Sequence, residues 1–427
     1  MPLLDWQIPL RDRLLGMPAK QARLVTLSTG SGKTYIATDY CKVRNEPQLV
    51  ICQKAVITSW KRVARDMEAA DPTFVLNWEQ LKTGKYPWWN PTTMRWNLPE
   101  GANIIVDEVH RGASGPDSQI TKMLALLKGY PVTVTMMSAT PASSPLQMRA
   151  IGYLMDEHKF TTSSFYDWCR THGCWYDRYL LRWRAPTGAQ AQRYMKAIND
   201  RLRDRMLHLK LEDIPGFPEC QTEAKLFDLD AKYAKQVTAI YDEMAQEIKE
   251  EGHTNPMVAA LRARQRAELV KIPLLADLAQ EALEEGKSVV LFVSFRETVG
   301  ALTNELKARD IASVTVMGGQ NDNERQANID MFQANLVHVM VATAGAGGVG
   351  ISLHDVRHER PRVSFITPNF SASEMKQCLG RIHRAGGTKA VQTFVLIANT
   401  IEEDVYRAIR SKFNNIESLV DSDFGAI

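Results

Sequence analysis

Seven residues near the amino terminus have the types and the spacing that phosphate binding requires. The segment STGSGKT, Ser28 to Thr34, lies between a short apolar run and an amphipathic stretch. Its glycines let the backbone N–H groups turn toward phosphate oxygens, Lys33 can reach the β and γ phosphates, and the Thr34 hydroxyl can bind Mg²⁺. Leu27 replaces the usual first glycine, so the match to the P-loop pattern is incomplete. We predict a nucleotide-binding loop that consists of Thr29, Gly30, Ser31, Gly32, Lys33 and Thr34.

A pair of acids follows an apolar run farther along the chain. The run NIIV leads into Asp107 and Glu108, within the sequence DEVH. Asp107 at the carboxyl end of a strand can hold Mg²⁺ through water, and Glu108 can polarise the attacking water. Two adjacent acids are also common at a solvated strand end. In a chain that also carries a phosphate loop, the pair predicts hydrolysis of ATP with Mg²⁺ as the metal.

Further motifs resemble those of superfamily 2 helicases, and the resemblance covers nearly the whole chain. DEVH matches the acidic box, SAT (Ser138–Thr140) matches the motif that links hydrolysis to lobe movement, and QCLGRIHRAGG (Gln377–Gly387) matches the arginine-bearing motif of the second lobe. The resemblance implies that ATP hydrolysis is coupled to lobe movement by His110, Ser138, Thr140 and Gln377. It also implies nucleotide contacts by Gly350 and, at the adenine edge, by Gln7. A glutamine in an ordinary amphipathic helix is the alternative reading of Gln7.

The arginine-bearing motif supplies two guanidinium groups. Arg381 and Arg384 are three residues apart in a stretch predicted to be helical, so we expect them on one face. A guanidinium beside the leaving γ-phosphate stabilises the charge that develops there and accelerates hydrolysis by about 10³–10⁵. The resemblance implies that both arginines act as fingers on ATP held by the other lobe.

Within the superfamily the chain is similar to Swi/Snf-type DNA translocases. The similar segments are ICQKAVITSWKRVARD, LNWEQL, MLHLKLEDIPGFPE, MGGQNDNERQANIDMF, TAGAGGVGISL and TIEEDVY. His208 and Leu209 occupy the positions of the usual arginine pair. The resemblance implies a minimal ATP-driven motor on duplex or forked DNA. The alternatives are an RNA helicase and a motor subunit of a restriction or repair complex. The implied DNA contacts are Lys54, Ser59, Trp60, Lys61, Ser294, Arg296, Gly318, Gly319, Gln320 and Thr343.

These residues must be positioned by alternating strands and helices. Short apolar runs alternate with helical patterns in the first and last thirds of the chain, which predicts an α/β fold with parallel, doubly wound sheets. Residues 156–285 read as mostly helical. By resemblance the sheets form two tandem RecA-like lobes. We expect a first lobe at 1–155, a helical basic-aromatic protrusion at 156–220 and a second lobe at 221–427.

Two segments combine basic and aromatic residues. From Phe160 to Lys210 there are ten Lys/Arg, four Asp/Glu and nine Phe/Tyr/Trp. Such a mixture suits a surface that follows or separates nucleic-acid strands, but it equally suits a protrusion with its own aromatic core. KYPWWNPTTMRW (Lys85–Trp96) is a second segment of this kind, for which a packed loop is favoured. CRTHGC (Cys169–Cys174) lacks a second close cysteine pair, so zinc is not favoured.

Composition sets the remaining expectations. The 427 residues are 44% hydrophobic and 24% charged, as in a soluble globular protein. The net charge of +3 neither requires nor excludes a polyanionic partner. No apolar run has the roughly 18 residues of a membrane span, and the amino terminus lacks the pattern of a secretory signal. Six scattered cysteines suit reduced thiols. We expect a cytoplasmic, monomeric protein with no membrane partner.

Overall fold

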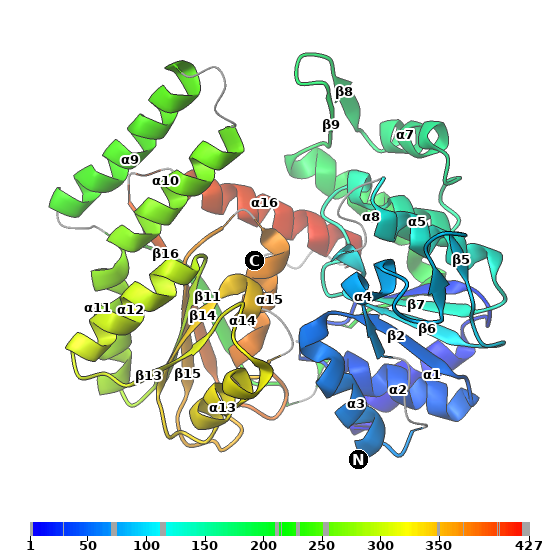
Figure 1. Cartoon of the computed structure of the whole chain (residues 1–427), viewed down its shortest axis with the longest axis horizontal. Helices are drawn as coiled ribbons and strands as arrows, with labels where there is room; N and C mark the ends of the chain where they lie inside the picture. The colour runs from blue at the N-terminus through cyan, green and yellow to red at the C-terminus, as the bar shows by residue number, and fades with distance from the viewer. Residues whose placement is uncertain are drawn as a thin grey trace. The chain divides into compact units, whose positions relative to one another are not determined.

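The chain forms two compact units in the computed structural model (Figure 1). The first unit consists of residues 1–215 and 411–427, and the second of residues 216–410. The structure describes residues 3–28, 30–69, 75–111, 117–209, 213–214, 216–227, 231–250, 256–347, 351–369, 371–398, 400 and 402–420.

The first unit is built on a sheet of six parallel strands. Their order is β10 (Met206–Leu207), β1 (Ala22–Val25), β7 (Thr133–Met137), β6 (Asn103–Asp107), β2 (Gln48–Cys52) and β3 (Val75–Asn77). Its helices are α1 (Ile8–Gly16), α2 (Lys33–Arg44), α3 (Ile57–Asp66), α4 (Trp78–Lys82), α5 (Gln119–Leu126), α6 (Arg149–Leu154), α7 (Thr162–Thr171) and α8 (Gly188–Leu202). The predicted doubly wound parallel sheet is thereby confirmed for this unit.

Both faces of this sheet are buried, which explains why its strands are apolar without alternation. Ile105 of β6 packs with residues of α1, α2 and α3 on one face. Its neighbours Ile104 and Val106 pack on the other face, with residues of α4 to α8. Because all strands are parallel, the segments after β1, β6 and β7 emerge at the same edge of the sheet. This is the edge that receives the P-loop, the DEVH box and the SAT motif.

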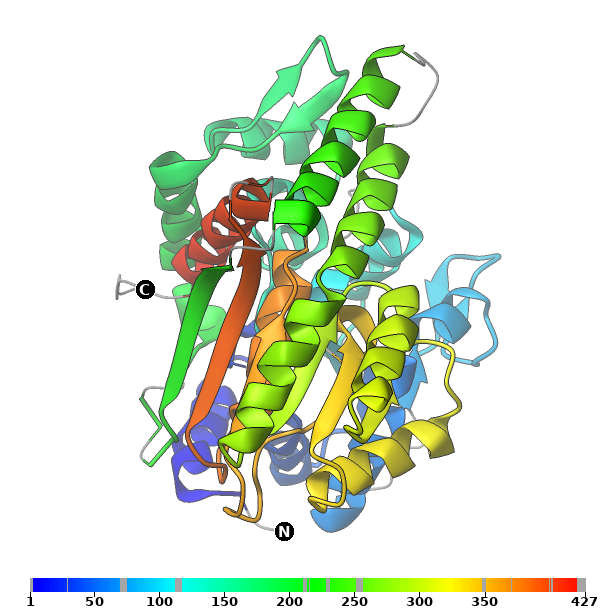
Figure 2. The same cartoon turned by 90° about the vertical axis from the view of Figure 1, so that its left-hand side faces the viewer.

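Two hairpins complete the first unit. β4 (Trp89–Asn90) pairs with β5 (Arg95–Trp96), and β8 (Trp175–Asp177) pairs with β9 (Arg182–Arg184). Trp89 and Trp96 are buried and contact each other, so the KYPWWNPTTMRW segment packs into the core of the unit. This agrees with the packed loop that the sequence favoured. The second hairpin projects from the helices around it (Figures 1 and 2).

The second unit holds another six-stranded parallel sheet. Its order is β11 (Cys220–Phe227), β16 (Ala390–Ile397), β15 (Arg362–Ile366), β12 (Ser288–Val293), β14 (Val339–Thr343) and β13 (Ser313–Val316). The helices are α9 (Ala231–Glu250), α10 (Pro256–Val270), α11 (Ile272–Glu284), α12 (Arg296–Ala308), α13 (Asp322–Gln333), α14 (Ala344–Gly347) and α15 (Ala372–Ile382). Apolar residues of α11 and α12 cover one face of the sheet, which faces the viewer in Figure 2.

Residues 156–285 are mostly helical, as expected, but they also contain strands β8 to β11. Helices α9 and α10 contact each other along their length and extend beyond the second sheet (Figures 1 and 2). The second unit therefore also carries a helical projection, formed by α9 and α10, in addition to the helical protrusion that the sequence predicts at 156–220.

The last helix, α16 (Glu402–Val420), is divided between the units after Arg410. Leu419 is fully buried in the core of the first unit, and Asn199 Nδ2 donates a hydrogen bond to its carbonyl oxygen. The predicted second lobe at 221–427 thus differs from the observed division at its end. Residues 411–427 group with the first unit, because the apolar face of α16 is buried there.

Candidate active site and nucleic-acid interface

The predicted P-loop connects β1 to α2. Gly30 and Gly32 have φ values of 89° and 73°, in the left-handed region that favours glycine. A Cβ atom on Gly32 would lie 2.3 Å from Gln7 Nε2, so a side chain there would displace Gln7. Helix α2 begins at Lys33 without a side-chain cap, which leaves its first N–H groups for an anion. Two predicted nucleotide contacts, Thr29 and Gly350, lie outside the described residues.

The polar groups of the loop fit a bound Mg²⁺–nucleotide. Ser31 Oγ donates to the carbonyl oxygen of Ser28, which holds the turn. Lys33 Nζ donates to the carbonyl oxygen of Leu27 over 2.8 Å, so the ammonium group lies across the loop. The Thr34 side chain is partly exposed in the first turn of α2. Lys33 and the helix end would bind phosphate, and Thr34 with Asp107 would hold Mg²⁺.

Gln7 lies directly beside this loop. Its Nε2 donates to the carbonyl oxygen of Ser31, and its Oε1 accepts a hydrogen bond from the N–H of Leu4. The side chain is only 4% exposed. This position agrees with the predicted nucleotide contact, and adenine recognition remains a prediction.

Asp107 ends β6 and sits in an environment that disfavours its charge. Burial and the neighbouring Glu108 raise the pKa of Asp107 to about 6, while Trp60 and Lys33 act in the opposite direction. Trp60 Nε1 donates to Asp107 Oδ2 over 3.0 Å. A carboxylate held in this way is ready to bind a cation that offsets the burial.

The observed position of Trp60 corrects its predicted role. The sequence placed Trp60 among the DNA contacts, but its side chain is 1% exposed and packs in the core of the first unit. Trp60 lies on the apolar face of α3, whereas its neighbour Lys61 is exposed. A buried indole offers no surface to DNA, and its one polar group is instead bonded to Asp107.

The predicted coupling residues of the first unit form one hydrogen-bonded network. Ser138 Oγ donates to Glu108 Oε2 over 3.3 Å, and His110 Nδ1 lies 3.2 Å from the same oxygen. His110 Nδ1 is also 2.9 Å from Ser138 Oγ, which accepts a hydrogen bond from the N–H of Thr140. Glu108 has a φ of 54°, a strained value for a residue with a side chain. The DEVH box and the SAT motif are therefore joined through the carboxylate of Glu108.

The two predicted arginine fingers converge on one acceptor in the second unit. Arg381 Nη1 and Arg384 Nη2 donate to the carbonyl oxygen of Ile351 over 3.0 and 2.9 Å. Arg384 Nη1 also donates to Ser352 Oγ. Burial and the nearby Arg381 lower the pKa of Arg384 to about 9. Gln377, the coupling residue of this motif, is buried on α15.

One detail of the arginine prediction requires correction. The sequence placed both arginines on one helical face, but α15 ends at Ile382 and Arg384 lies beyond it. His383 adopts an extended conformation at the helix end, with φ −115° and ψ 105°. The two guanidinium groups are brought together by the shared Ile351 carbonyl rather than by helical spacing.

Several predicted DNA contacts of the second unit lie together. A Cβ on Gly319 would lie 3.0 Å from the Arg296 guanidinium, so these two residues touch. Gly318, Gly319 and Arg296 are exposed. The amide of Gln320 instead closes its own turn, through the N–H of Met317 and both oxygens of Thr315.

The other predicted contacts differ in exposure. Lys54 and Lys61 of the first unit are exposed, and Ser59 is half-buried. Thr343 at the end of β14 is only 7% exposed, which corrects its predicted role because little of the side chain can reach a ligand. The exposed residues keep their predicted role.

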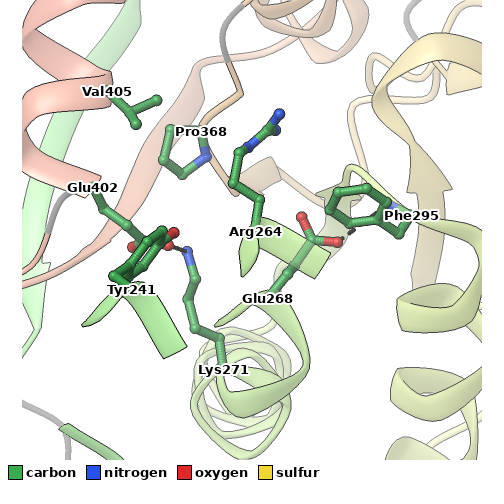
Figure 3. A pocket seen from close by; sticks show the side chains of 8 residues that line it. All are labelled: Tyr241, Arg264, Glu268, Lys271, Phe295, Pro368, Glu402 and Val405. Carbon is green, nitrogen blue, oxygen red and sulfur yellow. Dashed lines mark hydrogen bonds and ion pairs between the residues drawn. The ribbon is translucent and has the colours of Figure 1, made fainter. Parts of the chain in front are cut away.

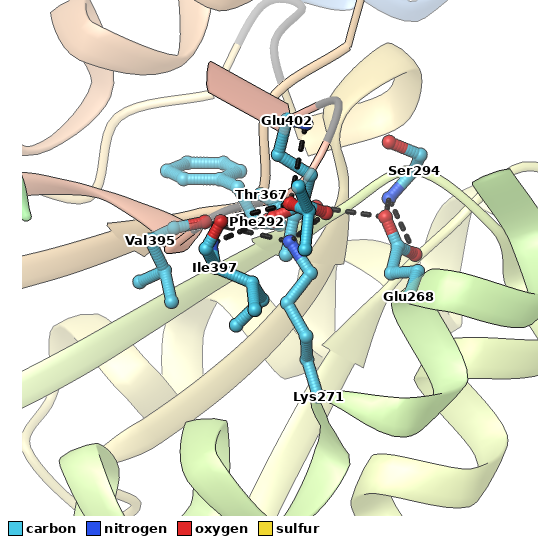
Figure 4. Close-up of polar contacts among 9 residues, drawn as sticks. Glu268, Lys271, Phe292, Ser294, Thr367, Val395, Ile397 and Glu402 are labelled. Atoms are coloured by element: carbon cyan, nitrogen blue, oxygen red, sulfur yellow. Dashed lines mark hydrogen bonds and ion pairs between the residues drawn. The ribbon is translucent and has the colours of Figure 1, made fainter. Parts of the chain in front are cut away.

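A buried acid fixes the segment that leads to Arg296. Both carboxylate oxygens of Glu268 accept the N–H of Ser294 over 2.9 Å, and Oε1 also accepts the N–H of Phe295. Thr367 Oγ1 donates to Glu268 Oε2 from the neighbouring strand end (Figure 4). Glu268 therefore ties α10 to the start of α12 and to the end of β15.

Lys271 and Glu402 extend this polar cluster. Lys271 Nζ lies 2.6 Å from Glu402 Oε1, and the two side chains are 1% and 9% exposed. Glu402 Oε2 accepts the N–H of Ile397, and Lys271 Nζ lies 3.4 Å from the carbonyl oxygen of Val395 (Figure 4). Sequence reasoning missed Glu268, Lys271 and Glu402. The sequence feature that could have revealed the first two is their spacing: Glu268 and Lys271 are three residues apart in a largely apolar helical stretch, where charged residues are seldom buried without a partner.

Glu268, Lys271 and Glu402 line a small pocket, and a larger groove adjoins this pocket. Arg264 and Phe295 line both, and Tyr241 and Pro368 close the small one (Figure 3). The groove has a volume of about 420 Å³ and is also lined by Ser294, Asn369 and Ser371. Hydroxyl, amide and guanidinium groups thus gather at the carboxyl ends of β12 and β15, where α/β proteins bind ligands.

No group of three or more His, Cys, Asp or Glu side chains able to hold a metal occurs among the described residues. Within the same part of the chain, no helix combines the length and the apolar character of a membrane span.

Comparison with known proteins identifies the family. The model of the helicase conserved C-terminal domain matches residues 270–386. A protein of Acanthamoeba polyphaga mimivirus, described as a candidate ATP-dependent RNA helicase, is 30% identical over 439 aligned residues. The alignment covers 94% of this chain and 80% of the relative. The chain belongs to the superfamily 2 helicases. As a member, this helicase is an ATP-dependent enzyme that acts on nucleic acid.

Other relatives of the helicase match over shorter lengths. The chromatin remodeling factor mit1 of Schizosaccharomyces pombe is 28% identical over 170 residues, 39% of this chain and 12% of the relative. The chromodomain-helicase-DNA-binding protein 1-like of Danio rerio is 27% identical over 152 residues, 35% of this chain and 14% of the relative. The helicase thus matches only a small part of these longer proteins.

The fold of the helicase is that of two RecA-like lobes. Saccharomyces cerevisiae Dbp5 bound to RNA and ADP BeF3 aligns with a TM-score of 0.54 at 14% identity, over 96% of this chain and 88% of that chain. At this identity the likeness concerns the fold alone. It confirms the predicted fold class.

Proposed function

We propose that this helicase is a DNA-dependent ATPase that translocates on duplex DNA and remodels or unwinds it. The observation that carries the catalytic part is the network of Glu108, His110 and Ser138, next to the P-loop. The network links the group assigned to water activation to the motif assigned to lobe movement. The choice of DNA is supported by the segments similar to Swi/Snf-type translocases and by relatives named for chromatin remodeling.

The residues of the first unit have separate roles in ATP binding and hydrolysis. Lys33 and the amino-terminal end of α2 bind and orient the triphosphate, and Thr34 and Asp107 hold Mg²⁺. The metal neutralises developing charge on the phosphate when bound. Glu108 orients the attacking water and holds its proton. Its carboxylate is kept in place by His110 and Ser138, so a shift of the SAT motif shifts Glu108.

The second unit contributes positive charge to hydrolysis and contacts to the DNA backbone. Arg381 and Arg384 act as arginine fingers, and their turn toward nucleotide would break their hydrogen bonds to the Ile351 carbonyl. Arg296 and the exposed Gly318–Gly319 backbone contact the DNA backbone, as do Lys54 and Lys61. Backbone contacts of this kind suit movement along DNA because they carry no sequence information.

A triplex-displacement assay tests the proposal. A third DNA strand bound to a duplex is displaced when a motor moves along the duplex without separating it. The wild type is expected to displace the third strand only with ATP and Mg²⁺. Lys33→Ala and Glu108→Gln are expected to bind the duplex and to displace nothing. ATP-driven displacement by Glu108→Gln at the wild-type rate would refute the proposed role of this residue.

A second candidate function is that of an RNA helicase. It is favoured by the mimivirus relative, which is described as a candidate for that activity. The two candidates differ in which nucleic acid stimulates ATP hydrolysis. An enzyme that separates RNA duplexes, and that does not displace the third strand of a DNA triplex, would be an RNA helicase.

A further inference from the structure

The β8–β9 hairpin carries exposed apolar side chains that no catalytic step requires. Tyr179 in its turn is 99% exposed, Leu181 74% and Leu180 51%. Trp175 and Tyr176 of β8 are about half exposed, at 51% and 46%. Isolated apolar residues on a surface are ordinary, but a contiguous apolar tip on a projecting element indicates a binding surface.

The tip has a defined conformation. Asp177 Oδ1 accepts the N–H groups of Tyr179 and Leu180 over 3.0 Å, and Asp177 Oδ2 accepts from Arg184 Nε across the hairpin. Leu181 has a φ of 47°, which turns the chain back into β9. A turn closed by these bonds presents Tyr179 in a defined direction, which lowers the entropy lost on binding.

The base of the hairpin is anchored to α7. The ring of Trp183 stacks on that of Tyr166, with centroids 4.3 Å apart and planes 7° from parallel. Tyr176 contacts the same indole edge-on, and the Arg170 guanidinium lies 5.1 Å from its centre. An isolated two-stranded hairpin is marginally stable, so this stack explains how so short a hairpin stays ordered. The aromatic residues of this segment therefore serve two purposes: Trp183 holds the base, and Tyr179 is left at the tip.

The charge around the tip is positive. Arg178 and Arg182 flank the apolar residues and are exposed. Neither forms an ion pair with an acid within the described ranges, whereas Asp177 is paired with Arg184. A partner that matches this surface must combine flat apolar faces with negative charge. Single-stranded nucleic acid does so, because each base has a π-face and each linkage a phosphate.

We propose that the hairpin tip binds unpaired bases at a junction between duplex and single-stranded DNA. Tyr179 stacks on a base that is no longer covered by its neighbour, and Arg178 and Arg182 bind the adjacent phosphates. An intact duplex offers no free base face along its length, so the tip distinguishes a junction from continuous duplex. This inference rests on the proposed function and adds to it a binding preference for DNA that contains a junction.

Comparative binding of full-length protein to two DNAs tests the proposal. One is a forked duplex with 2-aminopurine at the junction. The other is a blunt duplex of equal length with 2-aminopurine at the corresponding position. The wild type is expected to prefer the fork and to change the 2-aminopurine fluorescence. Tyr179→Ser is expected to weaken fork binding about tenfold through lost stacking. Blunt-duplex binding and duplex-stimulated ATPase should not change.

Two further variants make the result specific. Tyr179→Phe keeps the ring and should retain the fork preference. Leu336→Ser changes a side chain of the second unit that is also 74% exposed, and it should behave as the wild type. Because Tyr179 is fully exposed, the variants are expected to fold normally.

The outcomes separate this proposal from the proposed function. Fork preference and fluorescence that stay unchanged in Tyr179→Ser would overturn the role of the hairpin. So would a wild-type enzyme that is stimulated by DNA but shows no fork preference. Binding to anionic lipid vesicles that depends on Tyr179, without a fork preference, would assign the tip to a membrane. A wild-type ATPase that no nucleic acid stimulates would instead refute the proposed function itself.

Discussion

Trp60 Nε1 donates a hydrogen bond to Asp107 Oδ2 over 3.0 Å, and so links α3 to the end of β6. The partners are far apart in the sequence, and both are placed by the same sheet. The indole is buried, so this contact persists without competition from solvent. It fixes which way the Asp107 carboxylate faces, next to the P-loop lysine.

Replacement of Trp60 by Phe should weaken binding of Mg²⁺–ATP. The ring still fills the core, but the carboxylate loses its fixed donor. We expect a severalfold rise in KM for Mg²⁺–ATP, and a loss of about 1 kcal/mol in the free energy of unfolding for the lost hydrogen bond. Steady-state ATPase and urea unfolding measure the two effects. Trp78→Phe is the matched control, because Trp78 is also buried and its Nε1 has no partner in the described structure. Equal changes in KM for both variants would contradict the assigned role of Trp60.

Arg381→Ala should reduce turnover by about 10³ or more, with a smaller effect on ATP affinity, because an arginine finger acts chiefly in the transition state. Single-turnover hydrolysis and nucleotide binding separate these effects. Arg381→Lys retains the charge but loses the planar fork, and should also be slow. Arg357→Ala, at an exposed position of the same unit, should turn over normally. If Arg381→Ala hydrolysed ATP as fast as Arg357→Ala, the finger assignment would be wrong.

Much of this arrangement could be predicted because it depends on local pattern. Alternating apolar runs and helical stretches indicated two parallel sheets, and the strand ends indicated where the phosphate loop and the acids would lie. β11 was missed because its sequence, CQTEAKLF, is largely polar and exposed although it pairs along its length with β16. Such a strand is defined by its partner and not by burial.

The residues that were misjudged depend on distant partners. Trp60 precedes a basic pair in an amphipathic helix, a pattern that also fits a DNA contact. Only the three-dimensional structure shows Asp107 next to its indole. Glu268 and Glu402 were missed for the same reason, since each bonds to backbone N–H groups from other segments. A local sequence pattern does not show which distant group a buried polar or charged side chain contacts.

The buried pair of Lys271 and Glu402 should behave as one unit. Lys271→Met leaves an unpaired buried carboxylate and should lower the free energy of unfolding by about 3–5 kcal/mol. The Lys271→Met/Glu402→Gln double variant should lose less than the sum of the single variants. Lys287 forms an exposed pair with Glu285, so Lys287→Met should change the free energy of unfolding by only about 0–1 kcal/mol. Urea unfolding of the four variants gives these values. Additive effects of the Lys271 and Glu402 changes would show that the two charges do not interact.

His354 should make the second unit less stable in mild acid. Burial and the nearby Arg384 and Arg362 lower the pKa of His354 to about 4, below its ordinary value of about 6.5. The unfolded chain therefore binds a proton that the folded chain does not, and stability falls as the pH drops from about 6.5 toward 4. The His354 contribution should be about 1–3 kcal/mol across that range.

Urea midpoints between pH 7 and pH 5 measure this effect. His354→Gln should flatten the pH dependence of stability, whereas His358→Gln, at an exposed position nearby, should reduce it only slightly, because His358 is the smallest of the named contributions to the lowered pKa of His354. The same slope in His354→Gln and in the wild type would exclude His354 as its source.

The most direct test of the central claim is the ATPase rate of one enzyme preparation with duplex DNA, single-stranded DNA or RNA, with Glu108→Gln as the matched inactive variant. A DNA-dependent motor predicts a low basal rate, strong stimulation by duplex or forked DNA, weak stimulation by RNA, and no turnover by Glu108→Gln under any condition. Stimulation by RNA alone, or a rate that no nucleic acid changes, would contradict it.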